Sequence, residues 1–101
     1  MVKKFIAYDL ALELYNQCEG LKAKHHVKDQ LERAALSVAL NLAEGSGKPT
    51  MPEKRRFYSI ALGSLRETQT LLQIIKADDA IPVAHRLGGM IYRLVHPTVH
   101  G

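Results

Sequence analysis

Two long segments of helical periodicity, separated by a short turn, constrain the fold more than any other feature of this sequence. In residues 33–45, small and branched apolar side chains recur every three or four positions, and residues 57–72 repeat this design. Residues 45–50 between them read GSGKPT and are rich in turn formers. We therefore predict two neighbouring helices. The first should stop at Gly45, because glycine adopts the left-handed cap conformation without steric cost.

A stripe of polar residues runs beside the apolar face of each segment. Its members are Arg33, Ser37, Asn41 and Glu44 in the first segment, and Ser64 and Glu67 beside Gly63 in the second. We expect them to form a structural polar network between the two helices, with the hydroxyl and amide side chains exchanging hydrogen bonds. The two glutamates should be buried and paired with Arg33, Arg66, backbone amides or hydroxyls. A catalytic carboxylate pair is the alternative interpretation of Glu44 and Glu67.

The rest of the chain predicts two further helices. Glycine and proline residues mark the ends of helices. Within one domain, residues 1–101, they predict helices at about 5–19, 27–44, 52–77 and 82–95. No run alternates with period two, so no strand is expected. Short connections favour an antiparallel up-down-up-down four-helix bundle, an all-α fold. Tyr8, Leu12 and Tyr15 add a second apolar row to the first helix, which faces either another subunit or a wider core.

The sequence contains no pattern typical of an enzyme or a metal site. The GSGK stretch follows a helix and lacks the spacing of a phosphate-binding loop. The histidines lack zinc-site spacing, and no Glu-x-x-His pair is present. We therefore expect no catalytic residue, no metal and no cofactor. Cys18 is the single cysteine, which suits a core position in a cytoplasmic protein. The apolar runs are too short to cross a membrane, and the N-terminal stretch does not read as a signal peptide.

The formal charge of +4 makes an anionic partner admissible, including RNA, DNA or an acidic protein surface. On an antiparallel bundle, many of the basic residues fall at one end: Lys3, Lys4, Lys48, Lys54, Arg55, Arg56 and Arg93. This cluster predicts a nucleic-acid contact; the alternative is a solvated helix end that aids solubility. Only Phe57 and Tyr58 lie near the basic run, so binding should involve phosphates and show little sequence preference.

The two central segments also resemble a known family. R-A-A-L-S-V-A-L-N-L-A-E-G, a short G-K linker and F-Y-x-I-A-L-G-S-L-x-E-x-x-x-L-L are similar to the signature of bacterial four-helix bundle proteins encoded in 23S rRNA intervening sequences. The accessory variability protein of diversity-generating retroelements resembles the same family. The resemblance covers nearly the whole chain and is densest over residues 33–72. Lys48 replaces the usual arginine after the linker glycine, and the last helix is shorter than in the family.

This resemblance implies an antiparallel bundle assembled as a ring-like homopentamer, with a basic surface suited to nucleic acid and no catalytic activity. In the retroelement relatives it also implies a reverse transcriptase partner. Two functions are therefore expected: a nucleic-acid-binding module that acts through a basic rim, or a structural scaffold whose partner is another protein.

Overall fold

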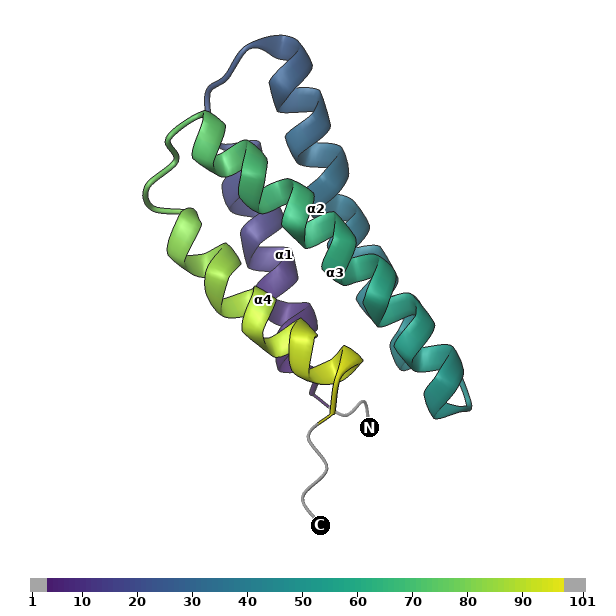
Figure 1. Ribbon diagram of the computed structural model, residues 1–101. Coiled ribbons are helices and arrows are strands. Elements are labelled where there is room, and N and C mark those ends of the chain that lie inside the picture. Colours follow the sequence, from purple (N-terminus) through teal and green to yellow (C-terminus); the bar gives the residue numbers. More distant parts are fainter. Residues whose placement is uncertain (1–3, 98–101) are drawn as a thin grey trace.

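The computed structural model describes residues 4–97, which form four helices and no strand. The helices are α1 (Ile6–Glu19), α2 (His25–Ser46), α3 (Met51–Ile74) and α4 (Ile81–Val95). Figure 1 shows that the chain turns back at each of the three loops, so that consecutive helices lie side by side. Helix α1 also contacts α4, which closes the arrangement into a bundle. No helix in the described part of the chain is long and apolar enough to span a membrane.

The core lies between the four helices and is built mostly of leucine and alanine. Leu14, Leu42, Leu65 and Leu87, one from each helix, are all almost completely buried. Burying a leucine side chain stabilises the fold by about 1.5–3 kcal/mol, so these positions drive the association of the helices. The expected apolar face of residues 33–45 is buried except at Ala43, which is exposed. This residue lies on the flank of α2 that faces the start of α1.

The expected stop at Gly45 is wrong, because α2 continues through this residue to Ser46. No glycine among residues 4–97 has a positive φ, and the residue that caps α2 is Gly47. Gly45 is buried instead against α3. A Cβ atom there would come within 2.7 Å of Cε1 of Tyr58. Glycine is therefore needed at this position for the close approach of two helices, and not for a turn.

Helix α3 is shorter than the expected 52–77, and the acids at residues 78 and 79 do not end it. It begins at Met51 and ends at Ile74. Lys76 then adopts a left-handed conformation, with φ of 57°. The amide of Ala77 donates to the carbonyl of Leu72 at 3.0 Å, and the amide of Lys76 donates to that of Gln73 at 3.2 Å. These two bonds form a Schellman motif, with lysine in the place that glycine usually takes.

The helices differ in length, and this difference shapes one end of the bundle. Helices α2 and α3 have 22 and 24 residues, whereas α1 and α4 have 14 and 15. At about 1.5 Å per residue, the central pair is longer by roughly 10–15 Å. At the end that holds the α2–α3 loop, this pair projects past the start of α1 and the end of α4 (Figure 1). The projection leaves a notch beside the start of α1.

Candidate nucleic-acid interface

The basic residues singled out in the sequence lie in four segments at the end of the bundle that holds the α2–α3 loop (Figure 1). Lys4 precedes α1, Lys48 lies in the α2–α3 loop, and Arg93 lies in the last turn of α4. The remaining three occupy the first turns of α3. We call this set the basic end: Lys4, Lys48, Lys54, Arg55, Arg56 and Arg93. Lys3, which was also expected here, lies outside the described residues.

These cations fall into two pairs: the first shares contacts with one aromatic ring, and the second lines one hollow. Lys48 Nζ lies 5.0 Å from the centroid of the Phe57 ring, and the Arg56 guanidinium lies 5.9 Å from it. Lys48 is also paired with a carboxylate oxygen of Glu44 at 3.1 Å. Lys4 and Lys54 form the second pair, because both line one hollow at the notch. No contact in the described part of the chain joins Arg55 or Arg93 to either pair.

The start of α3 is already capped by its own side chains. The hydroxyl of Thr50 accepts a hydrogen bond from the amide of Glu53 at 3.3 Å and donates to its carboxylate at 3.0 Å. A carboxylate in the first turn also interacts favourably with the helix dipole. Glu53 therefore already supplies a negative charge at the start of α3. Phosphate contacts at this end must come from lysine and arginine side chains.

Lys54 has a structural partner as well as a surface position. Its Nζ donates to the carbonyl of Ser46 at 2.8 Å, at the end of α2, where main-chain carbonyls lack helical partners. A carbonyl carries no formal charge, so the ammonium charge is not neutralised by this bond. Within residues 4–97, Lys54 forms no ion pair. The lysine thus joins α2 to α3 and keeps its positive charge beside the hollow.

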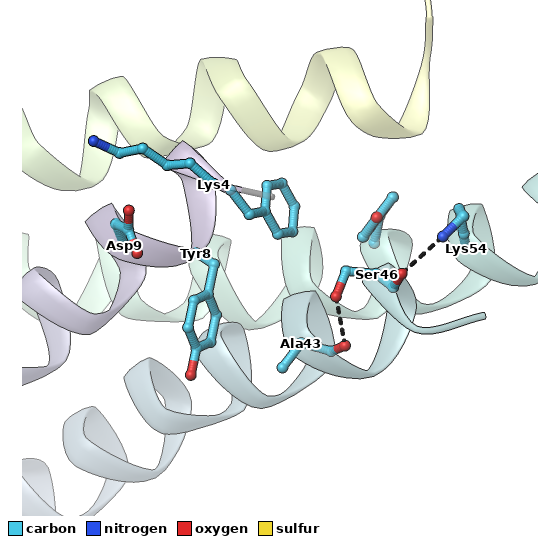
Figure 2. Close-up of a pocket in the computed structure, with 8 residues that line it drawn as sticks. Lys4, Tyr8, Asp9, Ala43, Ser46 and Lys54 are labelled. Atoms are coloured by element: carbon cyan, nitrogen blue, oxygen red, sulfur yellow. Dashed lines mark hydrogen bonds between the residues drawn. The ribbon is translucent and has the colours of Figure 1, made fainter. Parts of the chain in front are cut away.

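Figure 2 shows this hollow, which has a volume of about 970 Å³. Its lining comes from three places: Lys4 and Phe5 before α1 with Tyr8 and Asp9 in the first turn of α1, Ala43 and Ser46 from the end of α2, and Lys54 and Tyr58 from the start of α3. The rings of Phe5 and Tyr58 are 6.1 Å apart at 57°. Burial raises the pKa of the Tyr58 phenol, which is 7% exposed. The aromatic residues of α1 were not among the sequence-predicted site residues.

The structure brings three members of the expected polar network together. The hydroxyls of Ser37 and Ser64 lie 2.7 Å apart between α2 and α3. The side-chain amide of Asn41 donates to the carbonyl and the hydroxyl of Ser37, at 2.9 and 3.1 Å. Thr68, which is fully buried, donates to the carbonyl of Ser64 at 2.9 Å. These bonds satisfy the polar groups between the two helices, as burial requires.

The charged members of that set do not join this contact. Arg33, Glu44 and Glu67 are exposed, so the expectation that the two acids are buried is wrong. Neither Arg33 nor Glu67 forms an ion pair within the described residues, and Glu44 pairs only with Lys48. No contact joins the two carboxylates. They lie on the outer side of the polar stripe, which the neighbouring helix does not cover.

Apolar residues accompany these charges on the outer faces of α2 and α3. Leu36, Leu40 and Ile60 are 41%, 59% and 44% exposed. Gly63 lies on the same side of α3, and a Cβ atom there would meet nothing within 4 Å. In the second apolar row of α1, by contrast, Tyr8 and Tyr15 are half-buried and only Leu12 is exposed. The second apolar row of α1 therefore serves the core in part, and a larger exposed apolar surface lies elsewhere.

The described residues offer little for redox or metal chemistry. Cys18 is buried, and this burial raises the pKa of its thiol to about 11. Among residues 4–97, no three histidine, cysteine or acidic side chains gather into a possible metal site.

A family model described as 23S rRNA-intervening sequence protein matches residues 4–87. The match extends from two residues before α1 into the first half of α4, and it includes the two central helices. It confirms the resemblance on which the family expectation rests. No curated protein matches the chain.

Proposed function

The chain belongs to the 23S rRNA intervening-sequence protein family, and we propose that it is a non-enzymatic four-helix bundle protein that binds the phosphate backbone of RNA or DNA. Its helices are antiparallel, and it works in the cytoplasm as a ring-like homopentamer. The observation that supports this proposal best is the basic end. Six cations gather there, and the acids in the adjoining terminal turns are Asp9, Glu44 and Glu53.

The exposure of two arginines at the basic end supports a phosphate contact. Arg55 and Arg56 are exposed and form no ion pair among residues 4–97. Arginine presents several donors that match phosphate oxygens. A ring of subunits repeats the cluster around one rim, so that weak contacts add by multivalency. Binding of this kind depends on the release of counterions from the nucleic acid, and its affinity falls steeply as salt increases.

The exposed apolar residues support self-association. A glycine inside a helix costs about 1 kcal/mol relative to alanine. At Gly63 a Cβ atom would have room within the subunit, so packing inside the bundle does not explain the glycine. A helix from a second subunit that packs closely on α3 would explain why position 63 has no side chain. Leu40 and Ile60 would be covered by the same contact. We therefore assign the subunit interface to the outer faces of α2 and α3, and not to the Tyr8–Leu12–Tyr15 row.

A filter-binding titration across salt concentrations tests the role of the basic end. The variant carries Lys54→Glu, Arg55→Glu and Arg56→Glu together. The matched control reverses three exposed cations of the opposite end, Lys22, Lys24 and Arg86. The parent and the control should bind RNA or DNA with a steep salt dependence, whereas the variant should not bind. Circular dichroism and sedimentation verify that all three proteins share one fold and one assembly. Equal binding by the variant and the control would refute the proposal.

The second candidate function is a structural scaffold whose partner is another protein. The exposed leucine and isoleucine side chains of α2 and α3 favour it, because apolar patches of this kind mark protein interfaces. The family resemblance points to a reverse transcriptase as one such partner. If the parent protein binds neither RNA nor DNA at low salt, the scaffold becomes the better explanation. A monomer in sedimentation equilibrium at tens of micromolar would contradict the assembly required by both functions.

A further inference from the structure

The hollow at the notch combines flat apolar walls with a positively charged rim. Phe5 and Tyr8 are half-buried, so each keeps part of its ring accessible, while Tyr58 is buried at the back. Aromatic faces are the surfaces on which nucleic-acid bases stack, and each stacked base contributes about 1–3 kcal/mol. The volume of about 970 Å³ lies within the usual range for small-ligand sites. The hollow is therefore large enough for a base with its sugar.

Charged groups stand on both sides of these rings. Figure 2 shows Lys4 and Lys54 on opposite sides, with Tyr8 between them and Asp9 beside Lys4. The ammonium of Lys54 uses one donor on the Ser46 carbonyl and has two more for a phosphate. Asp9 supplies a carboxylate that can accept from the amino group of a base. Two cations against one acid leave a positive rim.

The hollow also adjoins the rest of the basic end. Lys54 is followed directly by Arg55 and Arg56, which are exposed. A nucleic-acid strand with a phosphate on Lys54 passes the mouth of the hollow, because Lys54 lines it. In a duplex the bases are stacked and paired inside the helix, so only an unpaired base can leave the strand and enter a pocket of this kind.

We propose that the hollow formed by the start of α1, the end of α2 and the start of α3 binds an unpaired base of single-stranded RNA or DNA. The base stacks on Phe5 and Tyr8, and its phosphates contact Lys4 and Lys54. This inference rests on the proposed function, and it adds a preference for single strands that a rim of charges alone does not supply. Lysines at the rim favour a polyanion over an apolar peptide as the occupant.

Three ligands with equal numbers of phosphates on the binding strand test this preference. They are a twelve-nucleotide single strand with one 2-aminopurine, the same strand without bases, and a blunt duplex. The parent should bind the strand with bases about tenfold more tightly than the other two ligands, which corresponds to one stacked base. The fluorescence of 2-aminopurine should fall on binding, because stacking on an aromatic ring quenches it.

Variants connect the preference to the hollow. Phe5→Leu with Tyr8→Leu removes the ring faces without changing charge, and it should lower affinity for the strand with bases about tenfold while leaving the other two affinities unchanged. Tyr15→Leu, at another half-buried tyrosine of α1, is the matched control and should retain the preference. Ala43→Leu adds a larger side chain to the wall of the hollow without removing any ring, so it should also lower the preference, and it serves as the test if the double variant is too unstable to measure.

Each contrary outcome has a distinct meaning. Equal binding of all three ligands by the parent would refute the pocket and leave the phosphate-binding function intact. Failure of the parent to bind any ligand at low salt would refute both. If the double variant and Ala43→Leu change the oligomeric state while the preference survives, the hollow holds a neighbouring subunit and the inference is wrong.

Discussion

Replacing Gly45 with alanine tests the close approach of α2 and α3. Alanine inside a helix is normally more stable than glycine by about 1 kcal/mol. At Gly45, however, the new Cβ would lie 2.7 and 2.9 Å from Cε1 and Cδ1 of Tyr58, and 3.1 Å from Cβ of Phe57. Tyr58 is buried and packs against Phe5, so moving its ring away from the new Cβ would disturb that packing.

The expected magnitude follows from comparing this variant with a second glycine. Overpacking a close contact costs about 1–3 kcal/mol. At Gly89, inside α4, a Cβ would meet only the end of the flexible Arg93 side chain at 3.6 Å. Gly89→Ala should therefore raise the free energy of unfolding by up to about 1 kcal/mol, the difference in helix preference between alanine and glycine. The difference between the two variants then isolates the overpacking cost of about 1–3 kcal/mol, because the helical preference largely cancels.

Urea unfolding followed by circular dichroism at 222 nm measures both free energies of unfolding. A loss of stability in Gly45→Ala would also be expected if Gly45 were a helix cap with positive φ. A second comparison therefore separates a clash with Tyr58 from a cap. Tyr58→Leu removes the ring atoms that the Cβ would meet, and in this background Gly45→Ala should lose most of its cost. The packing argument fails if Gly45→Ala raises the free energy of unfolding as much as Gly89→Ala does. It also fails if the cost of Gly45→Ala is the same in the Tyr58→Leu background as in the parent.

The remaining predictions concern an exposed acid, a left-handed lysine and a buried thiol. Glu67→Ala should change the free energy of unfolding by less than about 0.5 kcal/mol, because Glu67 is exposed; a large loss in urea unfolding would place this glutamate in a buried network or a subunit contact. Lys76→Gly should raise that free energy by about 1 kcal/mol by relieving the left-handed φ of 57°, whereas Lys76→Ala, which keeps a Cβ, should not. The Cys18 thiol has a pKa raised to about 11 by burial, so the reactive thiolate is scarce at pH 8; iodoacetamide should label the native protein far more slowly than the urea-unfolded protein, and equal rates would show that the thiol is accessible.

The secondary structure was largely predictable from the sequence, because its signals are local. Helical periodicity and the GSGKPT turn predicted four helices, and the expected 5–19 and 82–95 differ by one residue from α1 and α4. The ends of the central helices were less predictable. Lys76 closes α3 in a conformation that lysine rarely adopts, so the residue types at this end did not predict it. The family was also recognisable, since its motif is a linear pattern of residue types.

Tertiary packing decided which residues of the polar stripe are buried and which are exposed. Residues three or four apart share one side of a helix, but their burial depends on how much of that side the neighbouring helix covers. Helix α3 partly covers Ser37 and Asn41 and leaves Glu44 exposed. Likewise, a glycine next to a turn signal reads as a cap, and only the position of Tyr58 shows that Gly45 serves a close contact.

The sequence by itself determined the four helices, the family and the supply of cations at one end of the bundle. Only the tertiary structure placed Phe5 and Tyr8, at the start of α1, beside Lys54 and Tyr58 of α3. These residues are far apart in the chain, and the hollow between them exists because α2 and α3 are longer than α1 and α4. Helix length is a local property, but the end at which the excess projects depends on how the four helices pack together.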